Sequence, residues 1–318
     1  MPRTCKEGNC VCTSNAQLPE TITQLRELTQ VTDLGQDLES LALIGTQFEN
    51  ALVTTRNNSA PISDTGGYGP LQTNDMPFRL NRRRITLRIN RSVNLNLARS
   101  AEDRAQNLHA SLVATNSQGT VFHRVQYASA YDVRIANALA SDEHWRPQTA
   151  VLAPMADNIV PLAVIRQARE NWDTADAGTH LNDLLIDGGQ QRRKCLPYIG
   201  KDRCWRVIPN VVASFLCFLS DQKRSFTRMV PAPSLVQAHV GSATDVSMIG
   251  EVFMARFGQS TFSLNCADIA EAWVSACNRY WQLELFDVHK KAIAVLAADP
   301  MSETGSRNDF LASLPRAA

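Results

Sequence analysis

The residues best suited to metal or acid–base chemistry are six scattered histidines. They are His109, His123, His144, His180, His239 and His289. No two of them have the close spacing of a metal-ligating pair on one helix or strand. An isolated histidine is more often a hydrogen-bonded structural residue than a ligand. The histidines alone therefore predict no metal site.

Cysteine is the second residue type that could bind a metal. Cys5, Cys10 and Cys12 form a C-x4-C-x-C run near the N-terminus, and thiolates bind soft metals. The run lacks the paired C-x2-C spacing of a zinc site and has no histidine nearby. A disordered tail over residues 1–17 is the favoured interpretation, and metal binding is the alternative. The chain has 8 cysteines but no secretory signal, so a disulfide framework is not expected.

Two basic clusters could recognise anions. They are Arg82-Arg83-Arg84 and Arg192-Arg193-Lys194. The simpler interpretation is a solvated surface. The alternative is carboxylate or phosphate recognition, because the forked donors of arginine match these groups.

Composition and absent motifs exclude several function classes. The 32 Lys and Arg residues against 31 Asp and Glu leave a net charge of +1, which gives no general argument for nucleic-acid binding. The longest apolar run, Val211 to Leu219, is far shorter than the roughly 20 residues of a membrane helix. The polar start has no signal-peptide core, so a cytoplasmic location is expected. The chain contains no P-loop, nucleotide-binding glycine run, nucleophile elbow or H-E-x-x-H motif.

Hydrophobic periodicity predicts helices followed by strands, twice. In the first half, helical patterns from Thr21 to Ile44 precede alternating runs such as Ile85–Ile89 and Val121–Tyr127. In the second half, the segment Val207–Leu219 is expected to begin as a helix and pass into a strand. This order predicts an α+β fold built as a tandem structural repeat, each half having helices packed on a large antiparallel sheet. The predicted divisions are a tail at 1–17, a first repeat at 18–155 and a second repeat at 156–318.

Six short runs, in order over residues 20 to 318, carry a family pattern. They are Arg56-Asn57-x-x-Ala60 with Gly66 and Tyr68, Ile85–Ile89, Gly119–Val125, Ala267–Val274, Leu283–Asp287 and Phe310–Pro315. Together they resemble the motifs of the HemS/ChuS/ChuX-type hemin-degrading and heme-utilisation family. That resemblance implies two structural repeats and a b-type heme held by one axial histidine and by basic residues at the propionates.

The resemblance also implies site residues. Thr179-His180, before Leu184-Leu185, is similar to the family's axial-histidine segment, so His180 is the expected iron ligand. Arg192 matches an arginine after the family's glycine turn, and Arg88 matches the arginine of its I-D-L-R strand. Both are expected propionate contacts. The implied function is cytoplasmic heme trafficking in iron acquisition, with heme degradation left open.

Several family positions differ in this chain. The first-half histidine of the family is Ile62 here, and a late glycine-lysine-arginine run falls on Ala298-Asp299-Pro300. An alternative function is therefore a degenerate member that kept the scaffold, lost heme, and acts as an interaction module or binds another ligand. The implied partners are heme itself and a heme-uptake transporter or heme oxygenase, with no nucleic acid and no membrane insertion. The chain is expected to be a monomer or a homodimer.

Overall fold

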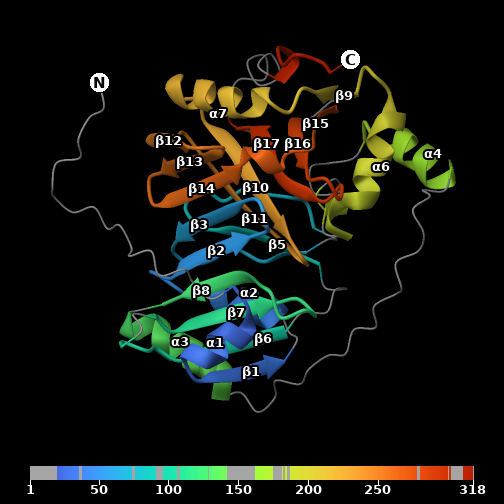
Figure 1. Cartoon of the computed structure of the whole chain (residues 1–318). Helices are drawn as coiled ribbons and strands as arrows, with labels where there is room; N and C mark the ends of the chain where they lie inside the picture. Colours follow the sequence, from blue (N-terminus) through green and yellow to red (C-terminus); the bar gives the residue numbers. More distant parts are fainter. Residues whose placement is uncertain are drawn as a thin grey trace, which may run out of the picture.

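The protein combines helices with two large sheets, which confirms the predicted α+β class. The computed structural model describes residues 20–317 apart from 36–37, 74–75, 91–95, 106–107, 128, 142–161, 175–180, 182, 185–186, 278–279, 300 and 302–310. Figure 1 shows α1, α2 and α3 at one end of the molecule and α7 at the other. The α-helices described are α1 (Ile22–Leu28), α2 (Leu38–Gly45), α3 (Ala130–Ser141), α4 (Leu162–Asn171), α6 (Gln190–Ile199) and α7 (Val211–Asp221).

One sheet has nine strands in the order β1-β6-β7-β8-β2-β3-β14-β13-β12. Every pairing in it is antiparallel. Its strands are β1 (Val31–Gly35), β6 (Asn96–Ser100), β7 (Ser111–Thr115), β8 (Val121–Gln126), β2 (Leu52–Arg56), β3 (Pro61–Thr65), β14 (Ser260–Asn265), β13 (Val252–Phe257) and β12 (Asp245–Ile249).

The other sheet has eight strands in the order β4-β5-β11-β10-β17-β16-β15-β9. All its pairings are antiparallel except β4 with β5. Its strands are β4 (Gln72–Thr73), β5 (Thr86–Ile89), β11 (Leu235–Gly241), β10 (Phe226–Ala232), β17 (Ala292–Ala298), β16 (Trp281–Phe286), β15 (Glu271–Ala276) and β9 (Cys204–Val207).

The two sheets repeat one topology. Six strands of the first half follow the spatial order β1-β6-β7-β8-β2-β3, and six of the second half follow β9-β15-β16-β17-β10-β11. Read along the chain, the two sets correspond strand for strand. The predicted tandem repeat is therefore present as an order of pairing. Its predicted boundary at residue 155 lies outside the described residues.

The repeats also exchange strands. The strands β4 and β5 of the first half extend the sheet of the second half beside β11, and β14, β13 and β12 extend the first-half sheet beside β3. Asn57 strengthens this junction, because its Nδ2 donates to the carbonyl oxygens of Pro231 at 2.9 Å and Ile293 at 2.7 Å. Each sheet therefore contains strands from both halves.

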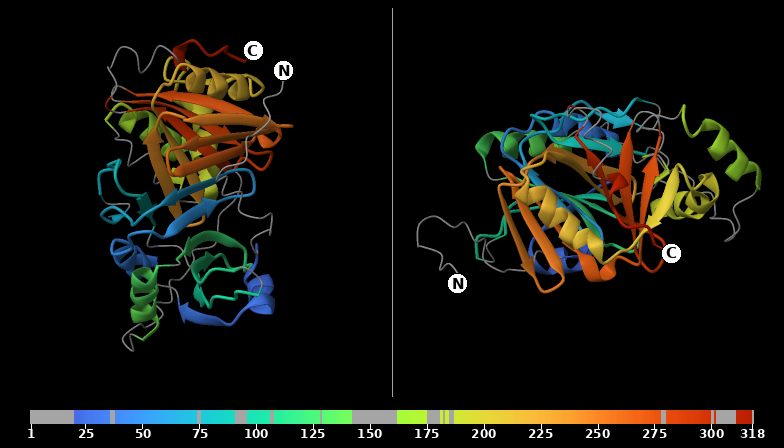
Figure 2. Two further views of the ribbon diagram at one scale, coloured as in Figure 1. Left: turned by 90° about the vertical axis from the view of Figure 1, so that its left-hand side faces the viewer. Right: turned by 90° about the horizontal axis from the view of Figure 1, so that it is seen from above.

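Helix α6 packs on one face of the eight-stranded sheet, and α4 packs against α6. The view from above in Figure 2 shows them together on one side of the molecule. Leu196 and Ile199 of α6 are buried in one cluster with Met229, Val236 and Val295 of the sheet. This apolar contact fixes α6 on the sheet, because an amphipathic helix is stabilised by burial of one face.

The segment expected to pass from helix into strand is a continuous helix. Helix α7 extends from Val211 to Asp221. Val212, Phe215, Leu216 and Leu219 are buried at spacings of three and four residues. The expectation of a strand was wrong, because these four side chains follow the 3.6-residue period of a helix and pack as one stripe.

Candidate functional site

The register of the eight-stranded sheet places Arg88 and Glu284 on its helix-covered face. Arg88 of β5 lies opposite Val236 of β11, and Glu284 of β16 lies opposite Val295 of β17. Directly opposed residues point to the same side of a sheet. Val236 and Val295 both belong to the cluster that includes Leu196 of α6. This face is the candidate functional site.

Arg192 is buried on this face in a two-pronged ion pair. Its Nε donates to Glu284 Oε2 at 2.7 Å, and its Nη2 donates to Glu284 Oε1 at 2.6 Å. Its Nη1 lies 3.4 Å from Asp183 Oδ2, and its guanidinium is 5.2 Å from the centre of the Trp172 ring. Such a forked pair has the geometry of the strongest protein ion pairs. The Arg192–Glu284 ion pair joins α6 to strand β16 inside the sheet.

Glu284 stays ionised although it is fully buried. Burial alone would raise its pKa, but the Arg192 charge and hydrogen bonds from Arg192, Ser275 and Gln282 outweigh it and lower the pKa below its ordinary value. Sequence inspection did not identify this residue. The available signal was a carboxylate between Leu283 and Leu285 in a strand with a buried apolar pattern.

Arg88 is also fully buried, and its two terminal nitrogens both donate to the Met76 carbonyl oxygen at 2.9 Å. Between Arg88 on β5 and Glu284 on β16 lie the strands β11, β10 and β17. Neighbouring strands are about 4.8 Å apart, so the two strand axes are separated by roughly 19 Å. The structure places Arg88 and Arg192 on one face but not in contact.

The third predicted residue, His180, lies outside the described residues. The described chain resumes at Leu181, which is fully buried with Leu184 in the cluster beneath α6. The same cluster includes Trp172, whose Nε1 donates to the Ala276 carbonyl oxygen at 2.8 Å. The segment that follows His180 is thus anchored on the same sheet face as Arg88 and Arg192.

A separate chain of buried polar groups crosses from one sheet to the other. Tyr68 Oη lies 2.6 Å from His123 Nε2, and Thr55 Oγ1 lies 2.8 Å from His123 Nδ1. Thr55 Oγ1 also donates to Gln237 Oε1 at 2.7 Å. All four side chains are buried, and they come from β8, β2, β11 and the segment after β3.

The hydrogen bonds of this chain fix the tautomer of His123. The Thr55 proton goes to Gln237, so Thr55 must accept from His123 Nδ1–H, and His123 Nε2 then accepts from Tyr68. Burial lowers the pKa of His123 to about 3 and raises the pKa of Tyr68, so both stay neutral at pH 7. His123 is a structural residue, as expected for an isolated histidine.

Tyr68→Phe is expected to lower the free energy of unfolding by about 1–3 kcal/mol, because it leaves the buried His123 Nε2 without a donor. Urea unfolding followed by far-UV circular dichroism measures this change. Tyr198→Phe is the control, since Tyr198 is 57% exposed and its substitution should have an effect within about 0.5 kcal/mol. Equal effects of the two substitutions would contradict the assignment.

Two features are absent from the described residues. No three His, Cys, Asp or Glu side chains gather there as a metal-binding group. No helix there is long and apolar enough to cross a membrane. Cys5, Cys10 and Cys12 lie outside the part of the chain that the structure describes.

Comparison with known proteins identifies the fold. No protein-family model matches the sequence, and no curated protein matches it. Among solved structures, holo-PhuS, a heme-binding protein from Pseudomonas aeruginosa, matches with a TM-score of 0.73 at 19% identity, over 93% of this chain and 90% of PhuS. The heme-degrading enzyme ChuS of Escherichia coli O157:H7 matches with a TM-score of 0.69 at 18% identity, over 90% of this chain and 87% of ChuS. The predicted resemblance is confirmed at the level of the fold.

Proposed function

We propose that this chain, which has the fold of PhuS and ChuS, is a cytoplasmic heme-binding protein that carries heme in iron acquisition. One observation carries the proposal beyond the fold. Two buried arginines, Arg88 and Arg192, lie on one helix-covered sheet face, and the segment directly after His180 is anchored on the same face. A b-type heme needs an apolar wall, an iron ligand and cations for its propionates, and this face supplies candidates for each.

His180 is the proposed axial ligand. A neutral imidazole is a common ligand of heme iron. Leu181 and Leu184 hold the following turn against the sheet, which would restrict the position of the histidine. Protonation removes the lone pair that binds iron, so hemin affinity should fall below about pH 6, near the ordinary histidine pKa.

Arg88 and Arg192 are the proposed propionate contacts. Arg88 donates to the Met76 carbonyl oxygen, and a propionate would take the place of this acceptor. A propionate at Arg192 would compete with Glu284, and an unpaired buried carboxylate is strongly destabilising. Through its pair with Glu284, Arg192 also positions α6 on the sheet.

Heme degradation by this chain would need oxygen and an electron donor at the iron. The sequence has no flavin- or nicotinamide-binding motif, so an external reductase would have to supply the electrons. A heme carrier needs neither oxygen nor an electron donor. The proposed partners are a heme-uptake transporter that delivers heme and a heme oxygenase that receives it, and the proposed assembly is a monomer or a homodimer.

One observation favours a second function, an interaction module on a scaffold that has lost heme. The Arg192–Glu284 pair satisfies both side chains without a ligand, so this face is stable as it stands. Such a protein would keep the sheets and the α6 contact and would show no affinity for hemin.

Titration of the whole protein with hemin tests these functions. The carrier predicts a saturable shift of the Soret band at one heme per chain, with affinity decreasing as the pH falls from 7.5 to 5.5. No shift would support the interaction module instead. A shift that disappears when residues 1–15 are removed would move the heme site to Cys5, Cys10 and Cys12 and would contradict the site on α6.

A further inference from the structure

A small cavity lies at the junction of the two halves, on the side of the eight-stranded sheet that faces away from α6. His239 of β11 lines it, whereas the neighbouring Ala238 points into the cluster beneath α6. The cavity has a volume of about 190 Å³. Pockets for drug-sized ligands are larger, about 300–1,000 Å³, so this cavity fits a small ion. Its walls are Asp64, Thr65, Arg82, Arg83, Arg84, Ile85, His239, Phe257 and Gln259.

Three consecutive arginines line one wall, and the chain holds their backbone in place. Asn81 Oδ1 accepts from the backbone N–H groups of Arg83 at 2.9 Å and Arg84 at 3.0 Å, which forms a side-chain-stabilised turn. Arg84 Nη1 donates to the Thr46 carbonyl oxygen at 2.7 Å, and Arg82 pairs with Asp299. Within the described residues, Arg83 has no carboxylate partner.

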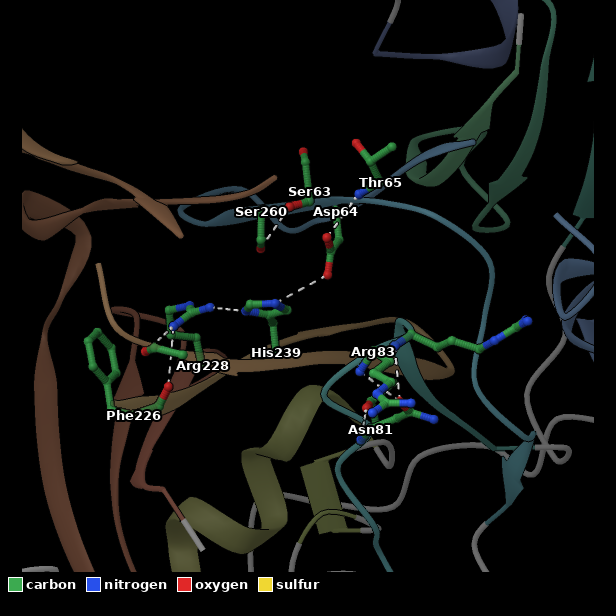
Figure 3. Close-up of polar contacts among 12 residues, drawn as sticks. Ser63, Asp64, Thr65, Asn81, Arg83, Phe226, Arg228, His239 and Ser260 are labelled. Atoms are coloured by element: carbon green, nitrogen blue, oxygen red, sulfur yellow. Dashed lines mark hydrogen bonds and ion pairs between the residues drawn. The ribbon is translucent and has the colours of Figure 1, made fainter. Parts of the chain in front are cut away.

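The opposite wall is a relay of three groups, shown in Figure 3. Arg228 Nη2 donates to His239 Nδ1, and His239 Nε2 lies 3.5 Å from Asp64 Oδ2. Because Arg228 can only donate, His239 Nδ1 must accept, and the proton of the neutral ring lies on Nε2 toward Asp64. Arg228 is fully buried against the ring of Phe257, and no described residue is a hydrogen-bond partner of its Nε.

Charge around the cavity is unbalanced. Arg82, Arg83 and Arg84 line it, and Arg228 stands directly behind His239. Among the residues that the structure describes, the carboxylates in contact with these groups are Asp64 and Asp299. Four guanidinium groups against these two carboxylates leave an excess of two positive charges. The acceptors of Arg84 are neutral carbonyls, so they do not reduce this excess.

We propose that this cavity binds a small doubly charged oxyanion, inorganic phosphate or sulfate, between the arginine wall and His239. The ion would balance the two excess charges, and forked guanidinium donors match the oxygens of a tetrahedral anion. At the inner wall, His239 Nε2–H is directed toward Asp64. The site lies on the opposite side of the sheet from the proposed heme site, so either can be occupied without the other.

Isothermal titration with sodium sulfate and sodium phosphate, at ionic strength held constant with sodium chloride, tests the site. Binding in the millimolar range is expected, about 4 kcal/mol, because the arginine wall is open to solvent. Arg83→Gln should weaken binding about tenfold, or 1.4 kcal/mol. Arg104→Gln is the matched control: it removes the same charge from an exposed residue that is paired with Glu102 away from the cavity.

Asp64→Asn should change sulfate affinity in the opposite direction to Arg83→Gln, which makes it the more specific test. It removes the negative charge that faces the anion, so sulfate should bind about tenfold more tightly. A variant that merely folds poorly would not gain affinity. Titration with glycerol phosphate, a phosphate monoester, distinguishes a site for a free ion from a site for a phosphoryl group. If glycerol phosphate binds as tightly as inorganic phosphate, the site recognises a phosphoryl group and the free-ion assignment is replaced.

The pH dependence of sulfate binding is a further readout. Burial raises the pKa of Asp64 to about 6. The hydrogen bond from the Thr65 N–H and the charge of Arg228 lower this pKa, but burial outweighs them. The facing His239 has its pKa lowered to about 3 by burial and by Arg228, and Arg228 has its pKa lowered to about 9. Only Asp64 among them titrates between pH 5 and 7. Its protonation removes a negative charge, so sulfate affinity should rise as the pH falls through 6.

Three outcomes would overturn the proposal. The first is that the wild-type protein binds neither sulfate nor phosphate at tens of millimolar concentration. The second is equal weakening of binding by Arg83→Gln and Arg104→Gln, which would indicate general charge screening. The third is an unchanged sulfate affinity in Asp64→Asn. Hemin titration of Arg83→Gln should match the wild type, which keeps this test separate from that of the heme site.

Discussion

Replacing Arg192 by alanine is expected to reduce the free energy of unfolding by about 3–5 kcal/mol. The substitution leaves the Glu284 carboxyl buried inside the sheet without its counter-ion, and Ser275 and Gln282 are then its donors among the described residues. It also removes the guanidinium that lies against the Trp172 ring. The expected loss is a large part of the 5–15 kcal/mol that stabilises a typical domain. Urea unfolding followed by circular dichroism and tryptophan fluorescence measures it.

Two variants separate the buried charge from ordinary loss of contacts. Changing both Arg192 and Glu284 to methionine removes the charges together and should recover most of the loss, because a buried ion pair can often be replaced by apolar residues of similar volume. Arg193 lies on the same helix as Arg192 and pairs with Glu271 of β15, and the two side chains are 15% and 14% exposed. Arg193→Ala breaks this less buried pair and should cost less than half as much. If the double variant were no more stable than Arg192→Ala, an unpaired Glu284 would not explain the loss.

Replacing His180 by alanine is expected to remove the axial coordination of hemin and to weaken binding by roughly two orders of magnitude, about 2.7 kcal/mol. Loss of a residue that merely orients a metal ligand already costs 10–100-fold, so loss of the ligand itself should cost at least as much. The Soret band of the variant should resemble that of hemin without a protein ligand. Optical titration and electron paramagnetic resonance of the ferric complex measure both effects.

His109→Ala is the control for this variant, because His109 is an exposed histidine of the other half. It should leave both the spectrum and the affinity unchanged. Added imidazole should restore a nitrogen-ligated spectrum to the His180 variant, which a misfolded protein would not allow. A variant that binds hemin with the wild-type spectrum would show that another residue coordinates the iron.

The parts of the fold that depend on local pattern could be predicted from the sequence. Alternating residues in segments such as Ile85–Ile89 and Val121–Tyr127 indicated strands, and strands β5 and β8 form there. The repeated order of helices and strands indicated a tandem repeat, and six strands of each half pair in the same order. The error at α7 arose from a run of apolar residues whose short length allows either structure.

The sequence by itself determined the fold class, the repeat and the group of proteins whose fold this chain shares. These features depend on local periodicity and on the order of short motifs, which involve residues that are close together along the chain. Only the tertiary structure decided how the repeats exchange β4–β5 and β12–β14, since strand pairing joins residues that are remote along the chain. It also decided the partners of the arginines. Arg192 meets Glu284 across 92 positions, and Arg82 meets Asp299 across 217. An arginine in a sequence is a free cation by default, and only the carboxylate that folding brings to it decides whether its charge holds a helix or remains for a ligand.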